Sequence, residues 1–382
     1  MGVRRAVIGV LPALGGGLTD LARTGQHDRL LRYDLAHYAD EFDEVRYFSY
    51  FDERLEDFTA DARLRASVRL YPRRLRVGRH LYALLLPLVH RRALAECDAL
   101  RVEQFTGVLP AVLARALGGV PYVVSYGYDY DAVARVRGPA WKPLYFAWLR
   151  RVAIPRAAGL ILPDADLGVR LRARWPGVRA LDLPNGVDAE HFAPGERAAD
   201  PGGGRVVLYA GRLSVEKNLL TLVEALARVG EPDVRLVLVG DGPEAARIRA
   251  RARARGVDVV LAGVVPNHAM PRHYRAADCF ALPSLTEGNP KALLEAMACA
   301  LPCVVSDRGG NRRLVADGET GLRVDPEDPG ALAAAIGRVL RDRALAARLG
   351  KAARERVLAA YDVHRLLGAE VRFVAGCARP GR

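Results

Sequence analysis

Residues 206–226 read VVLYAGRLSVEKNLLTLVEAL, a short apolar run followed by a glycine loop and then by a helical pattern. The run Val206–Ala210 is typical of a buried strand, and the apolar residues after Asn218 recur at the spacing of one helix face. The loop between them carries Arg212 and Lys217. Such a passage from strand through loop to helix is the building unit of parallel α/β sheets.

The same order of strand and helix recurs along almost the whole chain. In the second half the predicted strands are Val206–Ala210, Val234–Val239, Val257–Leu261, Cys279–Leu282, Cys303–Ser306 and Gly321–Val324. In the first half they are Arg4–Val10, Glu44–Ser49, Ala99–Val102, Tyr122–Ser125, Gly159–Leu162 and Arg179–Leu183. The alternation predicts an α/β protein of two Rossmann-like, doubly wound domains with parallel sheets.

A Pro- and Gly-rich stretch separates the two halves. Residues 193–204 have the composition of a linker, so we expect an N-terminal domain over 1–192 and a second domain over 205–360. Two such domains facing each other would form a cleft at the carboxyl ends of their strands, where nucleotides usually bind.

Composition narrows the class of protein. The 382 residues are 51% hydrophobic, which is enough for a core in each domain and excludes a disordered chain. The 57 Lys and Arg outnumber the 44 Asp and Glu, and the net charge of +13 indicates anionic partners. Nucleic acid, nucleotide-linked substrates and an anionic membrane surface all fit that charge. Nucleic acid is disfavoured because no aromatic stacking platform or recognition motif accompanies the arginines.

The cysteines and the apolar segments bear on the compartment. The five cysteines form no CxxC pair, so we expect reduced thiols and a cytoplasmic protein. The apolar run near the first residue reads as a strand rather than as a signal peptide. The longest apolar stretch free of charge, Leu81–Val89, is too short to span a bilayer.

Two cations mark the loop after the strand Val206–Ala210. Arg212 and Lys217 flank the start of a helix, an arrangement that suits a diphosphate whose charge grows as it departs. The alternative is a solvated pair of charges with no ligand.

Two carboxylates mark a second loop, in the stretch EGNPKALLEAMA at 287–298. Its glycine loop can offer backbone N–H groups to a phosphate while Glu287 reaches sugar hydroxyls. Glu295, about one turn into the next helix, can accept hydrogen bonds from both ribose hydroxyls. The alternative for Glu295 is an ordinary exposed helix position.

Taken together, these motifs resemble the retaining glycosyltransferases of family 4, the glycosyl transferases group 1, which have the GT-B fold of two Rossmann-like domains facing across a cleft. The resemblance rests on PNGVD at 184–188, GRL and EKN at 211–218, GDGP at 240–243, GVV at 263–265, the 287–295 block and GGN at 309–311. It covers most of the second half and is weaker in the first.

The resemblance implies roles for individual residues. The catalytic residues would be Arg212 and Lys217 on the donor diphosphate and Glu287 on the transferred sugar, while Glu295 would bind the ribose and the backbone near Val265 the base. The other donor-binding residues would be Gly16, Gly17, Gly211, Asp241, Gly288, Asn289, Pro290 and Lys291. The N-terminal domain would bind the acceptor, and a helix within 361–382 would cross back to it.

The chain departs from the family pattern at two positions. Tyr126, within SYGYD at 125–129, stands where the family commonly has a histidine near the reacting sugar, with Asp129 as the last residue of that motif. A phenol is not a cation near neutral pH, so Tyr126 cannot replace imidazole as a base. Arg313 stands near the position of a glutamate in many members. We expect Tyr126 and Asp129 on the acceptor or sugar side.

The resemblance implies transfer of a sugar from a nucleotide diphosphate sugar to a glycan or lipid-linked acceptor, with retention of configuration. We expect no metal and no cofactor, because no Asp-x-Asp motif ends a strand of the second half and the cations can stabilise the leaving group. Two alternatives stay open: a catalytically silent partner subunit of the same fold, and a sugar-nucleotide epimerase.

Two segments of the first half bear on the acceptor. Arg63–Arg92 contains nine arginines and no acidic residue, which fits either peripheral binding to the inner face of the cell membrane or a solvated basic face. A second segment has apolar residues at helical spacing, and we expect it to pack as a core face on the first sheet. Those residues are Trp141, Leu144, Tyr145, Trp148 and Leu149.

Overall fold

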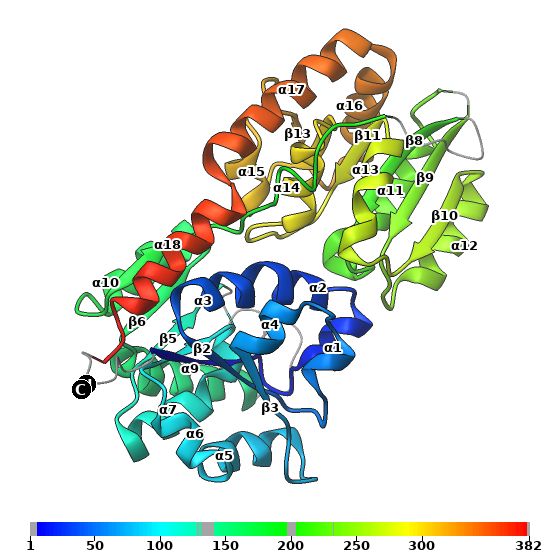
Figure 1. Ribbon diagram of the computed structural model, residues 1–382. Coiled ribbons are helices and arrows are strands. Elements are labelled where there is room, and N and C mark those ends of the chain that lie inside the picture. Colours follow the sequence, from blue (N-terminus) through cyan, green and yellow to red (C-terminus); the bar gives the residue numbers. More distant parts are fainter. Residues whose placement is uncertain (1–5, 128–129, 131–140, 197–203, 232, 380–382) are drawn as a thin grey trace. The chain divides into compact units, whose positions relative to one another are not determined.

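The computed structural model describes residues 6–127, 130, 141–196, 204–231 and 233–379. The chain divides into two compact units, each built on its own parallel sheet (Figure 1). Unit 1 takes the residues up to Pro184 and those from His364 onward, and unit 2 takes Asn185–Val363.

The sheet of unit 1 has seven strands in the order β3-β2-β1-β4-β5-β6-β7, and all neighbours are parallel. The strands are β1 Val7–Leu11, β2 Glu44–Phe48, β3 Val68–Tyr71, β4 Ala99–Val102, β5 Tyr122–Ser125, β6 Gly159–Leu162 and β7 Ala180–Asp182. Six of them confirm the predicted strands. The edge strand β3 lies inside the basic segment Arg63–Arg92, where its three exposed or half-exposed residues conceal the strand pattern.

Helices cover both faces of this sheet (Figure 1). The first face carries α5 Arg79–Val89, α6 Arg91–Ala95, α7 Val108–Gly118, α9 Trp141–Ala153 and α10 Ala165–Arg174. The second face carries α1 Leu18–Arg23, a helical run of α2 His27–Arg29, η1 Leu30–Leu35 and α3 Ala36–Glu41, then α4 Ala62–Ser67 and α18 Val363–Ala375. Short 3₁₀ turns are η2 Leu55–Asp57, η3 Phe105–Gly107 and η4 Ile154–Arg156. Burial on both faces explains why the strands are nearly continuous apolar runs.

The sheet of unit 2 has six parallel strands in the order β10-β9-β8-β11-β12-β13. They are β8 Arg205–Ala210, β9 Val234–Val239, β10 Asp258–Gly263, β11 Cys279–Leu282, β12 Cys303–Ser306 and β13 Leu322–Val324. All six predicted strands of the second half are thus confirmed, three with the predicted ends and three with ends shifted by one or two residues.

The helices of unit 2 also form two layers. On one side α11 Leu219–Leu226 packs against α12 Ala245–Arg255 and α16 Pro329–Arg341. On the other, α14 Lys291–Ala298 packs against α13 Met270–Ala276 and α17 Arg343–Ala360. The remaining elements are η5 Val215–Lys217, η6 Asn267–Ala269 and α15 Gly309–Leu314. Both units therefore have the doubly wound α/β fold that the sequence predicts.

The division between the units falls between Pro184 and Asn185, before the stretch 193–204 that has the composition of a linker. Val187 bridges Asp362 in parallel, and its N–H donates to the carbonyl of Tyr361 at 2.9 Å. Phe192 is 2% exposed within the core of unit 2. These contacts explain why residues from Asn185 onward group with unit 2.

Helix α18 joins the core of unit 1 through an ion pair. Nε of Arg101, on β4, lies 2.7 Å from Oε1 of Glu370 on α18, and both side chains are less than a tenth exposed. Tyr38 donates its hydroxyl to the same carboxylate at 2.8 Å. Burial, together with the Glu370 charge, raises the pKa of Tyr38 well above its usual range.

Helix α9 differs from the expectation. Trp141, Leu144 and Trp148 are 55%, 75% and 52% exposed, so they do not form the core face that their spacing suggested. Leu149 is buried as expected, together with Ala153, and Tyr145 packs half-buried against the same core. The prediction was thus wrong for Trp141, Leu144 and Trp148, because helical spacing does not show which side of a helix meets the core.

The five cysteines, Cys97, Cys279, Cys299, Cys303 and Cys377, are free and buried. Burial raises the pKa of Cys97 and of Cys299 to about 12. Among the described residues, no helix combines the length and the apolar composition that crossing a bilayer requires.

Candidate functional site

The candidate site lies where the strand order of unit 2 reverses. Strand β8 lies between β9 and β11, so the loops after β8 and β11 leave the sheet side by side in opposite directions. Such a switch point at the carboxyl ends of parallel strands forms a ligand-binding crevice in open α/β sheets. The N–H of Leu285 donates to the carbonyl of Glu216 at 2.9 Å and joins the two loops.

Lys217 and Glu287 meet where these two loops join. Nζ of Lys217 donates to Oε1 of Glu287 at 2.6 Å, and their side chains are 21% and 9% exposed. One residue ends η5 and the other follows β11, so the structure brings together two of the three residues expected to be catalytic.

The third, Arg212, lies on the same loop as Lys217 and is exposed. Its carbonyl accepts the hydroxyl of Tyr209 at 2.9 Å, which holds the backbone. No carboxylate in the described part of the chain pairs with its guanidinium. The two joined loops therefore offer one cation that is held by a carboxylate and one that faces solvent.

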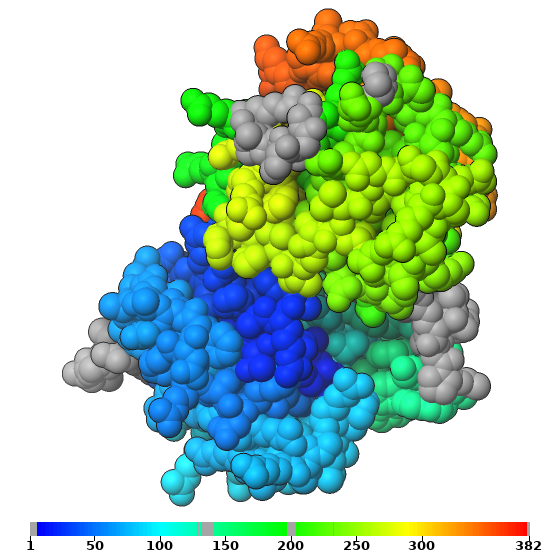
Figure 2. All heavy atoms as spheres, turned by 90° about the vertical axis from the view of Figure 1, so that its right-hand side faces the viewer, coloured from blue at the N-terminus to red at the C-terminus, as the bar shows by residue number. Residues whose placement is uncertain are grey.

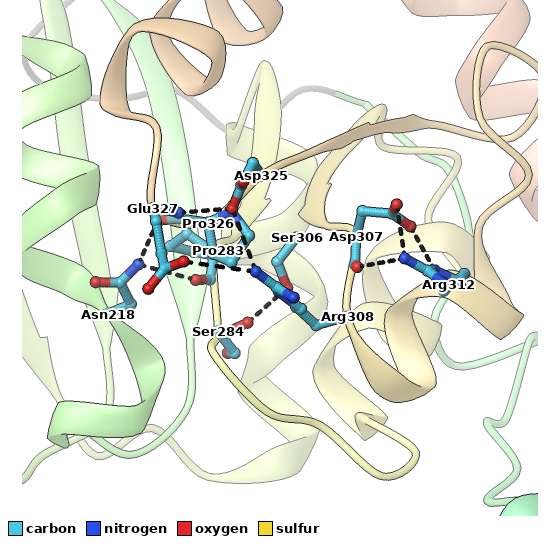
Figure 3. Close-up of polar contacts among 10 residues, drawn as sticks. All are labelled: Asn218, Pro283, Ser284, Ser306, Asp307, Arg308, Arg312, Asp325, Pro326 and Glu327. Carbon is cyan, nitrogen blue, oxygen red and sulfur yellow. Dashed lines mark hydrogen bonds and ion pairs between the residues drawn. The ribbon is translucent and has the colours of Figure 1, made fainter.

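Asn218 fixes the turn that follows Lys217, a role that sequence reasoning missed. Its backbone is left-handed (φ 57°, ψ 36°), a conformation that asparagine tolerates better than most residues. Its Nδ2 donates to the carbonyls of Pro283 at 3.3 Å and Pro326 at 2.7 Å (Figure 3). The turn is thereby tied to the loops after β11 and β13.

The loops after β8 and β9 also interlock. Gly240 has φ 125°, and a Cβ at this position would lie 2.0 Å from the carbonyl oxygen of Gly211. The N–H of Leu213 donates to the carbonyl of Asp241 at 3.0 Å. Asp241 is exposed, and its Oδ1 accepts the N–H of Gly242 at 2.7 Å. Only glycine allows these two backbones to approach so closely.

Backbone contacts and one arginine hold the loop that contains Glu287. The N–H of Gly310 donates to the carbonyl of Glu287 at 2.8 Å, and a Cβ on Gly310 would lie 1.8 Å from the carbonyl oxygen of Gly288. Arg313 donates to that Gly288 carbonyl at 3.1 Å. The departure noted at Arg313 thus places a cation on the backbone of the loop.

The same loop continues into α14. Asn185 donates its Nδ2 to the carbonyl of Asn289 at 2.6 Å, and Oδ1 of Asn289 is buried with no hydrogen-bond partner among the described residues. Pro290 precedes the first helical residue, Lys291, which is exposed. An acceptor without a partner at a helix start is suited to a donor group of a ligand.

Glu295 is buried rather than exposed. The residue is 8% exposed, and Oε2 accepts the hydroxyl of Tyr274 at 2.7 Å. Burial, together with the Glu295 charge, raises the pKa of Tyr274 well above its usual range, so the phenol remains a donor. Sequence reasoning missed Tyr274, because nothing in the sequence connects this residue of α13 with a carboxylate on α14.

Val265 follows β10 and is half-buried against the core of unit 2. The N–H of Gly240 donates to the carbonyl of Gly263 at 2.7 Å, which connects the end of β10 with the loop after β9. Val265 thus lies two residues after Gly263, the last residue of β10. In the sheet, β9 separates β10 from β8.

A cluster of polar side chains links the carboxyl ends of β11, β12 and β13 (Figure 3). Ser306 donates its Oγ to the carbonyl of Ser284 at 2.6 Å. Nη2 of Arg308 lies 3.5 Å from Oδ1 of Asp325 and 3.6 Å from Oε2 of Glu327. The hydrogen bond from Arg312 lowers the pKa of Asp307. Sequence reasoning did not identify these residues.

In unit 1, Gly16 and Gly17 lie between β1 and α1. The N–H of Gly16 donates to the carbonyl of Ala13 at 2.8 Å, and a Cβ on Gly17 would lie 2.4 Å from Oγ of Ser49. The carboxylate of Glu53 accepts the N–H groups of Leu18 and Thr19 at 2.9 and 2.7 Å. A side chain of the protein therefore already caps the start of α1, which sequence reasoning missed.

Tyr126 follows β5 and is 1% exposed. Its N–H donates to the carbonyl of Ile161 at 2.9 Å, and its ring packs edge-on against Phe105 and Tyr130 at centroid distances of 4.6 and 5.3 Å. The structure thus places Tyr126 in an aromatic cluster of unit 1. Asp129 lies outside the described residues.

Part of the chain is similar in sequence to known proteins. Residues 196–356 match the family described as Glycosyl transferases group 1. Over 255 residues the chain is 31% identical to a UDP-Gal:alpha-D-GlcNAc-diphosphoundecaprenol alpha-1,3-galactosyltransferase of Escherichia coli, covering 62% of this chain and 65% of that protein. Over 185 residues it is 35% identical to a GDP-mannose-dependent alpha-(1-6)-phosphatidylinositol monomannoside mannosyltransferase of Mycolicibacterium smegmatis, covering 44% of this chain and 48% of that protein. The chain thus spans between about half and two thirds of the length of these relatives.

Solved structures resemble the whole chain. Sucrose-phosphate synthase of Thermosynechococcus elongatus superposes with a TM-score of 0.80 at 23% identity and covers 97% of this chain and 99% of its own. HepE of Anabaena, solved with UDP and glucose, superposes with a TM-score of 0.75 at 20% identity and covers 97% of this chain and 100% of its own. These superpositions concern the fold. Residues 196–356 therefore belong to the glycosyl transferases group 1 family, as the motifs predict, and the chain as a whole has the GT-B fold.

Proposed function

We propose that this protein transfers a sugar from a nucleotide diphosphate sugar to a hydroxyl of a glycan or lipid-linked acceptor, with retention of configuration and without a metal or a cofactor. The observation that carries the proposal is the pair of Lys217 and Glu287, 2.6 Å apart at the switch point of unit 2. A cation and a carboxylate in contact at the carboxyl edge of a parallel sheet suit a ligand that combines phosphates with sugar hydroxyls.

Each charged group has a task in this reaction. Lys217 and Arg212 stabilise the negative charge that grows on the diphosphate as its bond to the anomeric carbon breaks. Glu287 accepts hydrogen bonds from hydroxyls of the transferred sugar, and Glu295, held by Tyr274, accepts those of the ribose. Gly288, Asn289 and Lys291 offer backbone N–H groups at the start of α14.

In the direct route to retention that we propose, the acceptor attacks from the side on which the diphosphate leaves. The new bond forms between the acceptor oxygen and the anomeric carbon, the bond to the phosphate oxygen breaks, and that phosphate oxygen takes the acceptor proton. This route needs no protein base, which agrees with a buried tyrosine at position 126. Lys217 and Arg212 can supply the charge stabilisation that a divalent ion supplies elsewhere.

The names of the relatives guide the choice of donor and acceptor. One relative is named for UDP-Gal and a diphosphoundecaprenol-linked sugar, and another for GDP-mannose and phosphatidylinositol monomannoside. We therefore propose a uridine or guanosine diphosphate sugar as donor, and a lipid-linked glycan as the first acceptor class to test.

The test is release of nucleotide diphosphate from UDP-, GDP- and ADP-sugars, with and without a lipid-linked acceptor, followed by mass spectrometry and NMR of the product. The proposal expects one donor to be consumed, an unchanged anomeric configuration, and the same rate in magnesium and in EDTA. No release from any donor would indicate a silent partner subunit. Conversion of the donor sugar without acceptor would indicate an epimerase.

A further inference from the structure

Large apolar side chains are exposed on one part of unit 1. Eight of the fourteen large apolar residues that are exposed in the described chain lie between Leu75 and Trp148. Three project from α5 and three from α9, and we call these six the outer apolar face: Leu81, Leu84 and Leu88, and Trp141, Leu144 and Trp148. Each set has i, i+3, i+7 spacing and so forms a single stripe on its helix.

The two stripes lie on the same layer of the unit. Helix α7 packs against both α5 and α9, and the inner sides of all three helices join one core beside the sheet (Figure 1). The ring of Tyr50 packs edge-on against Tyr82 of α5 at a centroid distance of 5.4 Å, and Tyr145 of α9 packs against the same core. Their outer sides therefore belong to one layer that faces away from the sheet.

The rings on α9 are suited to a bilayer interface. Trp141 and Trp148 lie on either side of Tyr145, with ring centroids 6.1 and 6.2 Å from it. Tryptophan and tyrosine combine an apolar ring with one polar group, and they are enriched at the level of lipid headgroups. A ladder of three such rings with Leu144 three-quarters exposed is costly to leave in water.

Arginines border the outer apolar face. Four exposed arginines near α5 have no ion pair with any carboxylate in the described residues: Arg74, Arg76, Arg91 and Arg92. Figure 2 shows the light-blue segment that contains the first two of them at the surface of unit 1. Arg151, at the end of α9, is also exposed and unpaired by the same criterion.

We propose that the outer apolar face and its border of arginines bind the surface of an anionic lipid bilayer. Apolar rings and leucines would enter the headgroup region while the unpaired guanidinium groups meet anionic headgroups. A second copy of the chain fits less well, because a two-fold contact of this face with itself would bring arginines opposite arginines. The proposal does not depend on the sugar-transfer reaction.

Vesicle flotation with the full chain tests this. The protein should float with vesicles in which part of the phosphatidylcholine is replaced by phosphatidylglycerol and should stay behind with phosphatidylcholine alone. Added salt should weaken the association, since exposed charges are screened. Absence of flotation with anionic vesicles overturns the proposal.

Paired variants separate the apolar from the electrostatic contribution. Trp141→Ala with Trp148→Ala, and separately Arg74→Gln with Arg76→Gln, should each lower the partition onto anionic vesicles about tenfold or more. The matched controls are Val169→Ala with Leu358→Ala, which are also exposed apolar positions, and Arg249→Gln with Arg253→Gln, which remove the same charge from α12. Equal losses in the controls overturn the proposal.

Fluorescence locates the contact. Brominated lipids should quench the emission of the native protein but not that of Trp141→Phe with Trp148→Phe, which keeps only Trp175. Circular dichroism of each variant should match the native spectrum. Sedimentation tests whether a second copy of the chain covers this face instead. A dimer that the tryptophan substitutions dissociate, together with no vesicle binding, would show that the face binds a second copy and not a lipid surface.

Discussion

Nζ of Lys217 lies 2.6 Å from Oε1 of Glu287, although the two residues are 70 positions apart in the sequence. They meet because β8 and β11 are neighbours in the sheet, and because each residue lies in the loop that leaves the carboxyl end of its strand. The contact holds the Lys217 ammonium beside the Glu287 carboxylate in the site proposed for the diphosphate and the sugar.

Removing the ammonium should slow transfer without unfolding the protein. Lys217→Ala should lower kcat for nucleotide diphosphate release by about 10²–10³-fold, the usual cost of losing one group that stabilises a developing charge. Lys217→Arg should retain part of the rate because it keeps the charge. Steady-state kinetics measures the effect.

The control for this change is Lys351→Ala, because Lys351 forms an exposed pair with Glu355 on α17. This variant should have native kinetics. Thermal melting accompanies both measurements, since Lys217→Ala leaves the mostly buried carboxylate of Glu287 without its partner. A native kcat in Lys217→Ala would contradict the role assigned to this ammonium.

Tyr274 should act through Glu295. Tyr274→Phe removes the hydroxyl that lies 2.7 Å from Oε2 of Glu295, so the carboxylate loses one fixed hydrogen bond. We expect the donor KM to rise about tenfold, which corresponds to roughly 1 to 1.5 kcal/mol for one such bond, while kcat changes little.

Tyr122→Phe is the matched control, since its hydroxyl is also buried and donates to a carbonyl, that of Ala153 in unit 1. Its donor KM should equal the native value. If Tyr274→Phe instead lowered kcat and left KM unchanged, Glu295 would act on the reacting centre rather than on the ribose.

Glu370 should be essential for the stability of unit 1. Glu370→Gln removes the charge that pairs with Arg101 at 2.7 Å, in a place where both side chains are less than a tenth exposed. An unpaired guanidinium would then stay buried, and breaking such a pair typically costs about 3–5 kcal/mol. Urea unfolding measures the difference.

The comparison for that experiment is Glu355→Gln, because Glu355 is 65% exposed and its ion pair is on the surface. Its cost should stay within about 0.5 kcal/mol. A chain that ends at Ala360 should be destabilised more than either variant, because it lacks the α18 residues Val371 and Val374 that belong to the unit 1 core. Equal unfolding curves for native protein and Glu370→Gln would refute the structural role of the pair.

His90 should make stability depend on pH. Burial, together with the charge of Arg74, lowers the pKa of His90 from 6.5 to about 4. Between these two values the unfolded chain binds a proton that the folded chain does not, so the free energy of unfolding falls as the pH decreases from 6.5 toward 4. The contribution of this one group reaches about 2 to 3 kcal/mol.

Chemical unfolding at several pH values across this window tests the prediction. His90→Gln should flatten the dependence relative to the native protein, whereas His80→Gln, an exposed histidine on α5, should leave it unchanged. Parallel curves for the native protein and His90→Gln would show that the imidazole does not carry the effect.

Much of the fold follows from local patterns. Strands such as β8 and β11 are apolar runs bounded by glycine and polar loops, so their positions and their order along the chain are predictable from the sequence. The edge strand β3 was missed, because an edge strand has exposed residues and its arginines hide the alternation. The boundary between the two compact units lies before the predicted linker 193–204, because Phe192 and Val187 pack into unit 2.

The site is predictable in part. Arg212, Lys217, Glu287 and Glu295 stand out because charged residues in loops after strands, or early in the following helix, have few structural reasons to be there. Tyr274, Asn218 and Glu53 were missed, since each acts through a partner that is distant in the sequence. No spacing rule links residues that belong to different elements.

The order of strands, loops and helices, and the kinds of side chain at each strand end, are therefore properties of the sequence itself, because backbone preference and hydrophobic periodicity act over a few residues. The tertiary structure alone decides that Lys217 contacts Glu287, that Glu370 pairs with Arg101, and that the tryptophans of α9 face solvent. These outcomes depend on which strands become neighbours and on which side of a helix meets the core, and both are settled by packing over the whole unit.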